Sequence, residues 1–136
     1  MFVGSIKLQT NDETQALRFD DIEKYRDGHG YTCTLIVRSR WLSFERRFFF
    51  DDRFLPGFIE GMEAMDRGQP GQVSLKGTWE TDELNLEMCR KGHVIISGQV
   101  TEHSELGQEL RFALRTDQTV LGPLIRDLKE LYKAQA

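Results

Sequence analysis

The pattern of apolar and polar residues changes its period near the end of the chain. Leu110, Phe112 and Leu114 alternate with polar residues, as in a strand with one buried face. The apolar residues that follow recur at the spacing of an amphipathic helix (Leu121, Leu124, Ile125, Leu128 and Leu131). We therefore predict a strand over 108–115 that leads into a closing helix over about 121–134.

A second helix is predicted in the middle of the chain, over about 55–67. Its apolar residues also recur at helical spacing (Leu55, Phe58, Ile59, Met62 and Met65). Pro56 suits the first turn of a helix, and Gly68 suits the left-handed position just past the last turn. Both ends of this helix are thus marked in the sequence.

The segments before the first helix carry the two-residue alternation of strands. Strands are predicted over 2–8, 31–38 and 42–50, and the last two form a hairpin. The weaker pattern between them predicts a short edge strand over 16–19 and a charged loop over 20–30.

Between the two helices the sequence predicts an antiparallel meander, with strands over 73–79, 84–88 and 93–101 before the one at 108–115. The order is therefore β-rich, helix, β-meander, helix. This order predicts an α+β fold in which a largely antiparallel, twisted sheet of about six to eight strands packs against two helices. The predicted core is apolar and faces inward from these elements (Leu35, Val37, Phe44, Phe48, Phe58, Ile59, Met62, Leu75, Trp79, Leu86, Ile95, Phe112, Leu124, Ile125 and Leu128).

The length of 136 residues fits a single globular domain over residues 1–136. No window approaches the ~20 apolar residues of a membrane span, and the first residues lack the regions of a secretory signal. We therefore expect a cytoplasmic protein with no membrane segment. The formal net charge of −4 disfavours general binding to nucleic acids, which requires a cationic surface.

No group of residues has the spacing of a catalytic, metal or cofactor site. His29, His93 and His103 fall in turns, loops or strand starts without the short spacing of metal ligands. Cys33 and Cys89 are far apart in sequence, which leaves a disulfide open, although buried free thiols are expected. We predict a protein that is not an enzyme and holds neither metal nor cofactor.

A cluster of arginines and a tryptophan surrounds the turn of the predicted hairpin (Arg38, Arg40, Trp41, Arg46 and Arg47). Cationic groups interleaved with aromatic rings can stack bases and neutralise phosphates, so the cluster is a candidate site for single-stranded nucleic acid or a small molecule. Alternatively, the arginines decorate a solvated sheet face and pair with acids. The acids are concentrated in the segment 12–27, which includes Asp12, Glu13, Asp20 and Asp21.

Three stretches of the sequence carry a resemblance to a known family. They are LRFALRTDQTVL at 110–121, FIEGM at 58–62 and GHVIISG at 92–98. With them the chain resembles a small bacterial family without an established function, which is similar to the WapI-type immunity proteins. The resemblance covers roughly residues 30–132. It implies a protein that neutralises a cognate secreted toxin, and it brings no active-site residues with it.

The leading functional hypothesis is a protein-binding module that occludes a toxin by surface complementarity. The acidic segment would face a basic partner, and aromatic side chains would anchor the contact. The candidate partner-binding residues come from the acidic segment and the arginine hairpin (Asp12, Glu13, Asp20, Asp21, Arg38, Arg40, Trp41, Arg46 and Arg47). The alternative is a small-molecule or single-stranded nucleic-acid binder that uses the five hairpin residues.

Overall fold

The computed structural model describes residues 4–10, 12–25, 28–77, 82–89, 92–102 and 105–133. These residues contain eight strands and two α-helices, and a short 3-10 helix precedes each α-helix. In chain order the elements are β1 (Ile6–Gln9), β2 (Ala16–Lys24), β3 (Gly30–Arg38), β4 (Ser43–Asp51), α1 (Leu55–Asp66), β5 (Gly71–Lys76), β6 (Glu83–Met88), β7 (His93–Glu102), β8 (Gln108–Asp117) and α2 (Leu121–Lys133).

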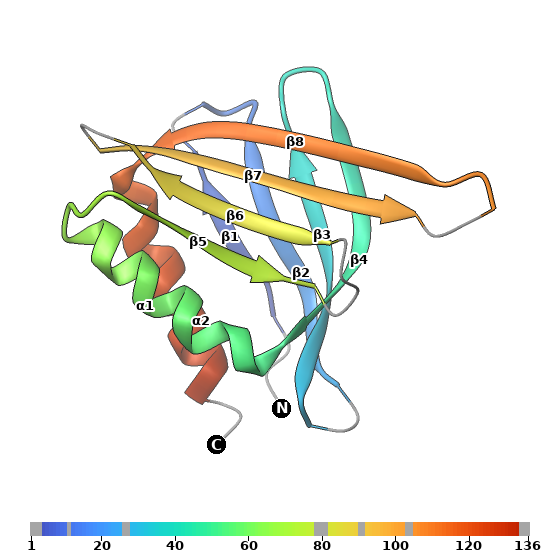
Figure 1. The fold of residues 1–136 in the computed structure, drawn as a ribbon, viewed down its shortest axis with the longest axis horizontal. Coiled ribbons are helices and arrows are strands. Elements are labelled where there is room, and N and C mark those ends of the chain that lie inside the picture. Colours follow the sequence, from blue (N-terminus) through green and yellow to red (C-terminus); the bar gives the residue numbers. More distant parts are fainter. Residues whose placement is uncertain are drawn as a thin grey trace.

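The strands form two four-stranded antiparallel meanders. The first sheet has the order β1-β2-β3-β4 and the second has the order β5-β6-β7-β8. The strands of the two sheets cross steeply in Figure 1, and apolar side chains from both sheets and both helices join one core. Helix α1 packs on β5 and on α2, and α2 also contacts β1. The helices therefore cover the region where β1 and β5, the first strands of the two sheets, lie.

The α+β fold, the antiparallel pairing and the element order agree with the sequence prediction. The strands divide into two sheets, where one sheet was expected. The division falls where α1 interrupts the run of strands, because a helical connection does not hold β5 against β4 as a tight hairpin would. Within the described residues the two sheets are joined by a single antiparallel bridge between Phe50 and Gly77.

Strand β2 corrects the prediction for the first third of the chain. It is nine residues long and lies between β1 and β3, so it is neither short nor an edge strand. The predicted charged loop begins only after Lys24. The alternation is hidden because the register shifts between Asp20 and Glu23, where Asp21 has a φ of +52°. A bulge of this kind inserts an extra residue and reverses the two-residue pattern beyond it.

Most of the predicted core is buried, and Phe44 packs against it while half-buried. Ile95 is a correction. Its neighbours Val94 and Ile96 are fully buried, whereas Ile95 lies on the opposite, outer face of β7. Three consecutive apolar residues show no alternation, so the sequence did not reveal which face points inward. The predicted core residue Trp79 lies outside the described residues.

The residues at the ends of the two helices have the types that usually start or stop a helix. Pro56 lies in the first turn of α1, and Gly68 takes the left-handed conformation, with a φ of +91°, just beyond its end. A 3-10 turn over Gln118–Val120 precedes α2. The side chain of Asp117 caps this turn by accepting a hydrogen bond from the backbone N–H of Thr119 at 2.9 Å.

Candidate partner-binding surface

The structure brings five of the nine candidate residues to one end of the first sheet. Consecutive antiparallel strands place the β1–β2 turn and the β3–β4 turn at the same end, so residues far apart in sequence become neighbours. We call these five residues the hairpin-tip surface (Asp12, Glu13, Arg38, Arg40 and Trp41). Asp12 and Glu13 come from the first turn, Arg40 and Trp41 from the second, and Arg38 is the last residue of β3.

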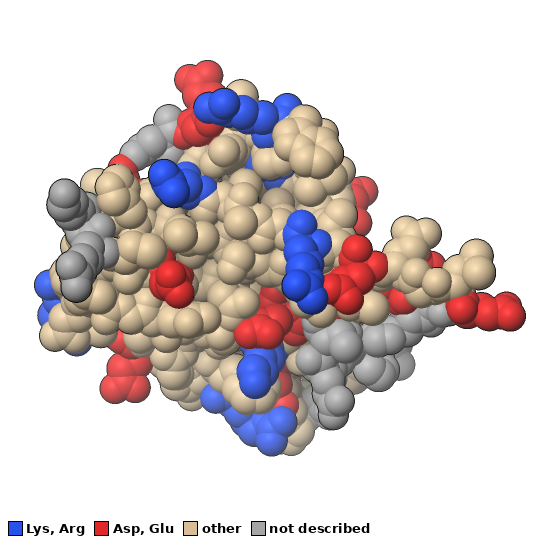
Figure 2. Space-filling view, turned by 45° about the horizontal axis from the view of Figure 1, so that its top comes forward, with Lys and Arg blue, Asp and Glu red and all other residues tan. Residues whose placement is uncertain are grey.

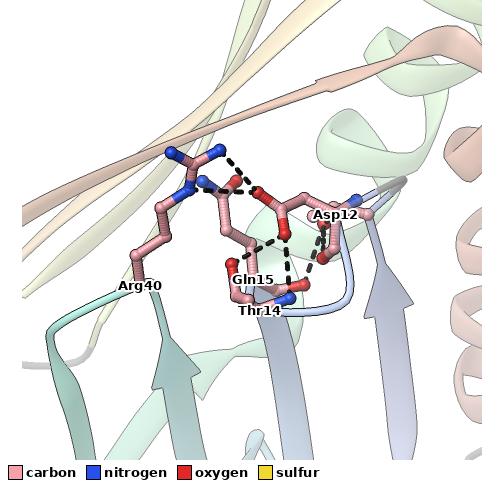
Figure 3. Close-up of polar contacts among 5 residues, drawn as sticks. Asp12, Thr14, Gln15 and Arg40 are labelled. Atoms are coloured by element: carbon pink, nitrogen blue, oxygen red, sulfur yellow. Dashed lines mark hydrogen bonds and ion pairs between the residues drawn. The ribbon is translucent and has the colours of Figure 1, made fainter.

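Asp12 links the two turns (Figure 3). One carboxylate oxygen accepts hydrogen bonds from the backbone N–H of Thr14 at 2.9 Å and from its hydroxyl at 2.7 Å. The other oxygen lies 3.4 Å from Nη2 of Arg40. The hydroxyl and the backbone N–H of Thr14, together with the Arg40 guanidinium, lower the pKa of Asp12. Asp12 is therefore ionised at neutral pH. It orients the Arg40 guanidinium, and the Arg40 side chain stays exposed.

Trp41 is the most conspicuous member of this surface. Its side chain is 90% exposed, although an indole ring has a large apolar area. The guanidinium of Arg40 beside it in sequence is also well exposed. An exposed tryptophan at a turn contributes little to the core, and tryptophan in particular is enriched in protein interfaces.

A hollow of about 320 Å³ lies beside these turns. Its walls carry charges of both signs, from Asp12, Glu13, Arg18 and Arg38 among others. Figure 3 shows the Gln15 side chain reaching toward the Asp12–Arg40 pair, and its Oε1 is buried with no hydrogen-bond partner among the described residues. The end of the sheet is therefore a mixed-charge, uneven surface with an exposed tryptophan.

Arg46 is not part of this surface. It lies on the inner face of β4, where its Nη2 is 3.3 Å from a carboxylate oxygen of Asp82 and also donates to the backbone carbonyl of Thr101. Asp82 is only 3% exposed, and its second oxygen accepts from the backbone N–H of Thr101 at 3.0 Å. Arg46 therefore ties the first sheet to β7 and to the segment before β6.

The remaining candidates are spread over the first sheet. Asp20 is half-buried and is held by the hydroxyl of Ser5 and by Arg18, whose Nη2 lies at 2.8 Å. Burial would raise the pKa of Asp20, but these two groups outweigh it and lower the pKa. Asp21 is exposed at the bulge of β2, and Arg47 is exposed on the outer face of β4, with its guanidinium 6.0 Å from the ring centre of Phe49.

The predicted arginine cluster is thus divided among a turn, an inner face and an outer face. Figure 2 agrees with this division, because on the face that it draws the basic side chains stand apart and several have acidic neighbours. Sequence reasoning also missed Asp82 and Thr101, the partners of Arg46. No local signal could have identified them, since the contact depends on how the two sheets meet.

No group of three or more histidine, cysteine or acidic side chains that could hold a metal ion occurs in the described part of the chain. Cys33 is buried and Cys89 is partly buried, and both are free thiols, so the disulfide that the sequence left open is absent. Burial raises the pKa of the Cys33 thiol to about 12. Such a thiol is protonated at neutral pH and is a poor nucleophile.

The model of the immunity protein WapI-like family matches residues 5–135, nearly the whole chain. The chain belongs to the WapI-like immunity protein family. This membership confirms the resemblance noted in the sequence and extends it to the acidic first third, which the three motifs did not cover. No curated protein and no solved structure gives a significant match. None of the helices described is long and apolar enough to cross a membrane.

Proposed function

We propose that this protein is a cytoplasmic, non-enzymatic immunity protein that binds a protein toxin and blocks it by covering its surface. Membership of the WapI-like immunity protein family supports the general role, since such a protein acts by binding a toxin. The observation that carries the proposal for this chain is the hairpin-tip surface. It presents a 90% exposed tryptophan beside a fixed pair of opposite charges.

A few residues supply most of the binding energy at a protein interface. Tryptophan and arginine are enriched in the hot spots of protein interfaces. A tryptophan buries a large area and orders only two side-chain torsions, and an arginine presents a planar set of hydrogen-bond donors. Trp41 would enter a pocket on the toxin, and Arg40 would be held beside it by Asp12. The turn backbone around Asp12 is already organised by Thr14, which reduces the ordering required when a partner binds.

Net charge supports a basic partner. The chain carries a formal charge of −4, and an acidic binder attracts a basic protein over distances of about 10 Å at moderate salt. The effect is on the rate of encounter more than on the final affinity. We therefore expect the association rate constant with the toxin to fall as salt is raised, while the dissociation rate constant depends mainly on Trp41.

The experiment is to express the open reading frames adjacent to the gene of this protein and to measure binding and protection against any product that is toxic. Trp41→Ala should weaken binding by about 30-fold or more, because loss of a tryptophan hot spot costs about 2 kcal/mol or more. Leu106→Ala is the matched control, since Leu106 is 91% exposed and lies in the β7–β8 loop, away from the hairpin tips. Growth of cells that produce the toxin should be protected by the wild type and by Leu106→Ala.

Two results would count against this proposal. If the wild type neither binds the toxin nor protects cells, the immunity function is wrong. If the wild type binds and Trp41→Ala binds equally well, the function stands but the surface is misassigned. The nucleic-acid alternative required one exposed arginine patch, and this condition is not met because Arg46 is paired with Asp82 and Arg47 faces another side.

A further inference from the structure

The free edge of β8 is the feature that the proposed function does not use. Each sheet has two edge strands, and in this protein three of the four are tied to other elements. Helix α2 contacts β1, α1 packs along β5, and β4 is joined to the second sheet by the Phe50–Gly77 bridge and by Arg46. Figure 1 shows β8 along the outer border of its sheet, and among the described residues no further strand of that sheet pairs with it.

Strand β8 is also long and regular. All ten residues, Gln108–Asp117, pair with β7 without a register shift, and the strand contains no proline. Natural edge strands are commonly shortened, bulged or interrupted by proline, because a straight edge offers unpaired backbone N–H and C=O groups to another chain. About half of the backbone polar groups of β8 point away from β7 and are available for such pairing.

The charged side chains on the outer face of β8 suit a second copy of the same strand. Within one copy, Nε of Arg111 already lies 2.7 Å from a carboxylate oxygen of Glu109. On the outer face of the sheet, β8 presents Glu109, Arg111, Ala113 and Arg115, all exposed. Two antiparallel copies related by a two-fold axis at Phe112 would place Glu109 of each opposite Arg115 of the other. The same register matches Leu110 with Leu114 on the inner face and pairs residues 108–116, which is all of the strand except Asp117.

Moving the two-fold axis by one residue in either direction removes the pairing of Glu109 with Arg115. With the two-fold axis at Ala113, Arg111 would face Arg115 and Glu109 would face Asp117, and like charges directly opposite each other are destabilising. With the axis at Arg111, the two copies of Arg111 would face each other. The sequence of β8 therefore favours the register centred on Phe112 over its two nearest alternatives.

We propose that the protein forms a symmetric dimer through β8, in which the second sheets of two copies join into one continuous eight-stranded antiparallel sheet. Each copy contributes the backbone groups of one edge strand, and one Glu109–Arg115 pair forms between the copies on each side of the axis. The partner is a second copy of this chain and not a toxin strand, because the favoured register is defined by the charges of β8 against themselves. The inference is independent of toxin binding, which we assign to the hairpin-tip surface.

The experiment is sedimentation equilibrium of the full chain across protein concentrations, with charge-swap variants at exposed positions. The wild type should associate to a dimer. Glu109→Arg would place arginines opposite each other twice in the dimer, so it should raise the dimer dissociation constant about tenfold or more. The double variant Glu109→Arg with Arg115→Glu restores the opposite charges and should regain the wild-type dissociation constant. Glu130→Arg, the same charge change on the exposed face of α2, should leave the dimer unchanged.

Each outcome is decisive. A wild type that stays monomeric up to about millimolar concentration, where even a weak interface is populated, overturns the proposal. A dimer that Glu109→Arg does not weaken, or that the double variant does not restore, contradicts the pairing through β8. Circular dichroism of each variant separates loss of the dimer from loss of the fold. Because toxin binding is read out by a different variant, failure of the dimer leaves the immunity proposal untouched.

Discussion

Two arginine–aspartate pairs in this protein have the same chemistry and different surroundings. Arg46 and Asp82 meet where the two sheets join, and the Asp82 side chain is 3% exposed. Arg40 and Asp12 meet at the hairpin tips, where the Arg40 side chain is 76% exposed. Water screens the second pair and is largely excluded from the first. Burial, more than residue type, therefore separates an arginine that holds the fold together from one that remains free to meet a partner.

The largest effect should come from breaking the buried pair. Arg46→Ala would leave the Asp82 carboxylate buried without its cation, and removing one partner of a buried pair costs about 3–5 kcal/mol. Because Arg46 is itself 26% exposed, we expect a loss near the lower value, about 3 kcal/mol. Urea unfolding followed by circular dichroism measures it. Arg40→Ala is the matched control and should move the midpoint far less; equal shifts would contradict the comparison.

A steric change at the same junction should have the next largest effect. A Cβ atom at Gly77 would lie 2.9 Å from Cβ of Asp82 and 3.2 Å from the backbone oxygen of Phe49. Gly77→Ala should therefore destabilise the protein by about 2 kcal/mol through overpacking. Gly57→Ala is the control, because nothing lies within 4 Å of its added Cβ in α1 and alanine favours a helix. In thermal unfolding, the melting temperature should fall for Gly77→Ala and rise for Gly57→Ala.

Labelling of the two cysteine thiols can report how tightly the junction between the two sheets is closed. Cys33 lies on β3 opposite Phe48, it is fully buried, and burial raises the pKa of its thiol to about 12. In the native wild type at pH 8, a thiol reagent should modify Cys89 and leave Cys33 unreacted. Arg46→Ala should accelerate labelling of Cys33, because opening of the sheet junction exposes β3. Rapid labelling of Cys33 in the wild type would show that the junction is open without any substitution.

The smallest effect concerns pH at the hairpin tips. Because the pKa of Asp12 in the folded protein is lowered from its ordinary value of 3.8, its contribution to stability is present above that value. The contribution is lost as pH falls through the lowered pKa, when the carboxylate is protonated in both states. Asp12→Asn should therefore leave a shallower loss of stability below about pH 4 than the wild type shows. Identical acid-unfolding curves for the two proteins would contradict this assignment.

Much of the fold could be predicted from local patterns. The helix ends followed from Pro56, Gly68 and the spacing of apolar residues, and the alternation over 31–38 marked the inner face of β3 correctly. The prediction failed where a local pattern was interrupted or ambiguous. Asp21 at a positive φ broke the alternation of β2, and the run of three apolar residues around Ile95 had no alternation at all.

The division of the candidate site was beyond prediction for a different reason. Arg38, Arg40, Arg46 and Arg47 look alike in sequence, and only the pairing of sheets decides which of them is buried. The contact of Asp12 with Arg40 and that of Asp82 with Arg46 join segments from different hairpins. The sequence left open that hairpin arginines pair with acids of the segment 12–27, and Arg40 and Asp12 form such a pair. Asp82, the partner of Arg46, lies outside that segment, and its contact depends on how the two sheets meet.

The most direct test of the central claim is hydrogen exchange of this protein alone and in complex with a toxin that it is shown to bind and neutralise. If the hairpin-tip surface is the binding site, amides in the two turns, at residues 10–15 and 38–43, should gain protection in the complex. The junction around Arg46 should change little, because its amides are already protected by the fold. Protection confined to other elements, with both turns exchanging as in the free protein, would contradict the account.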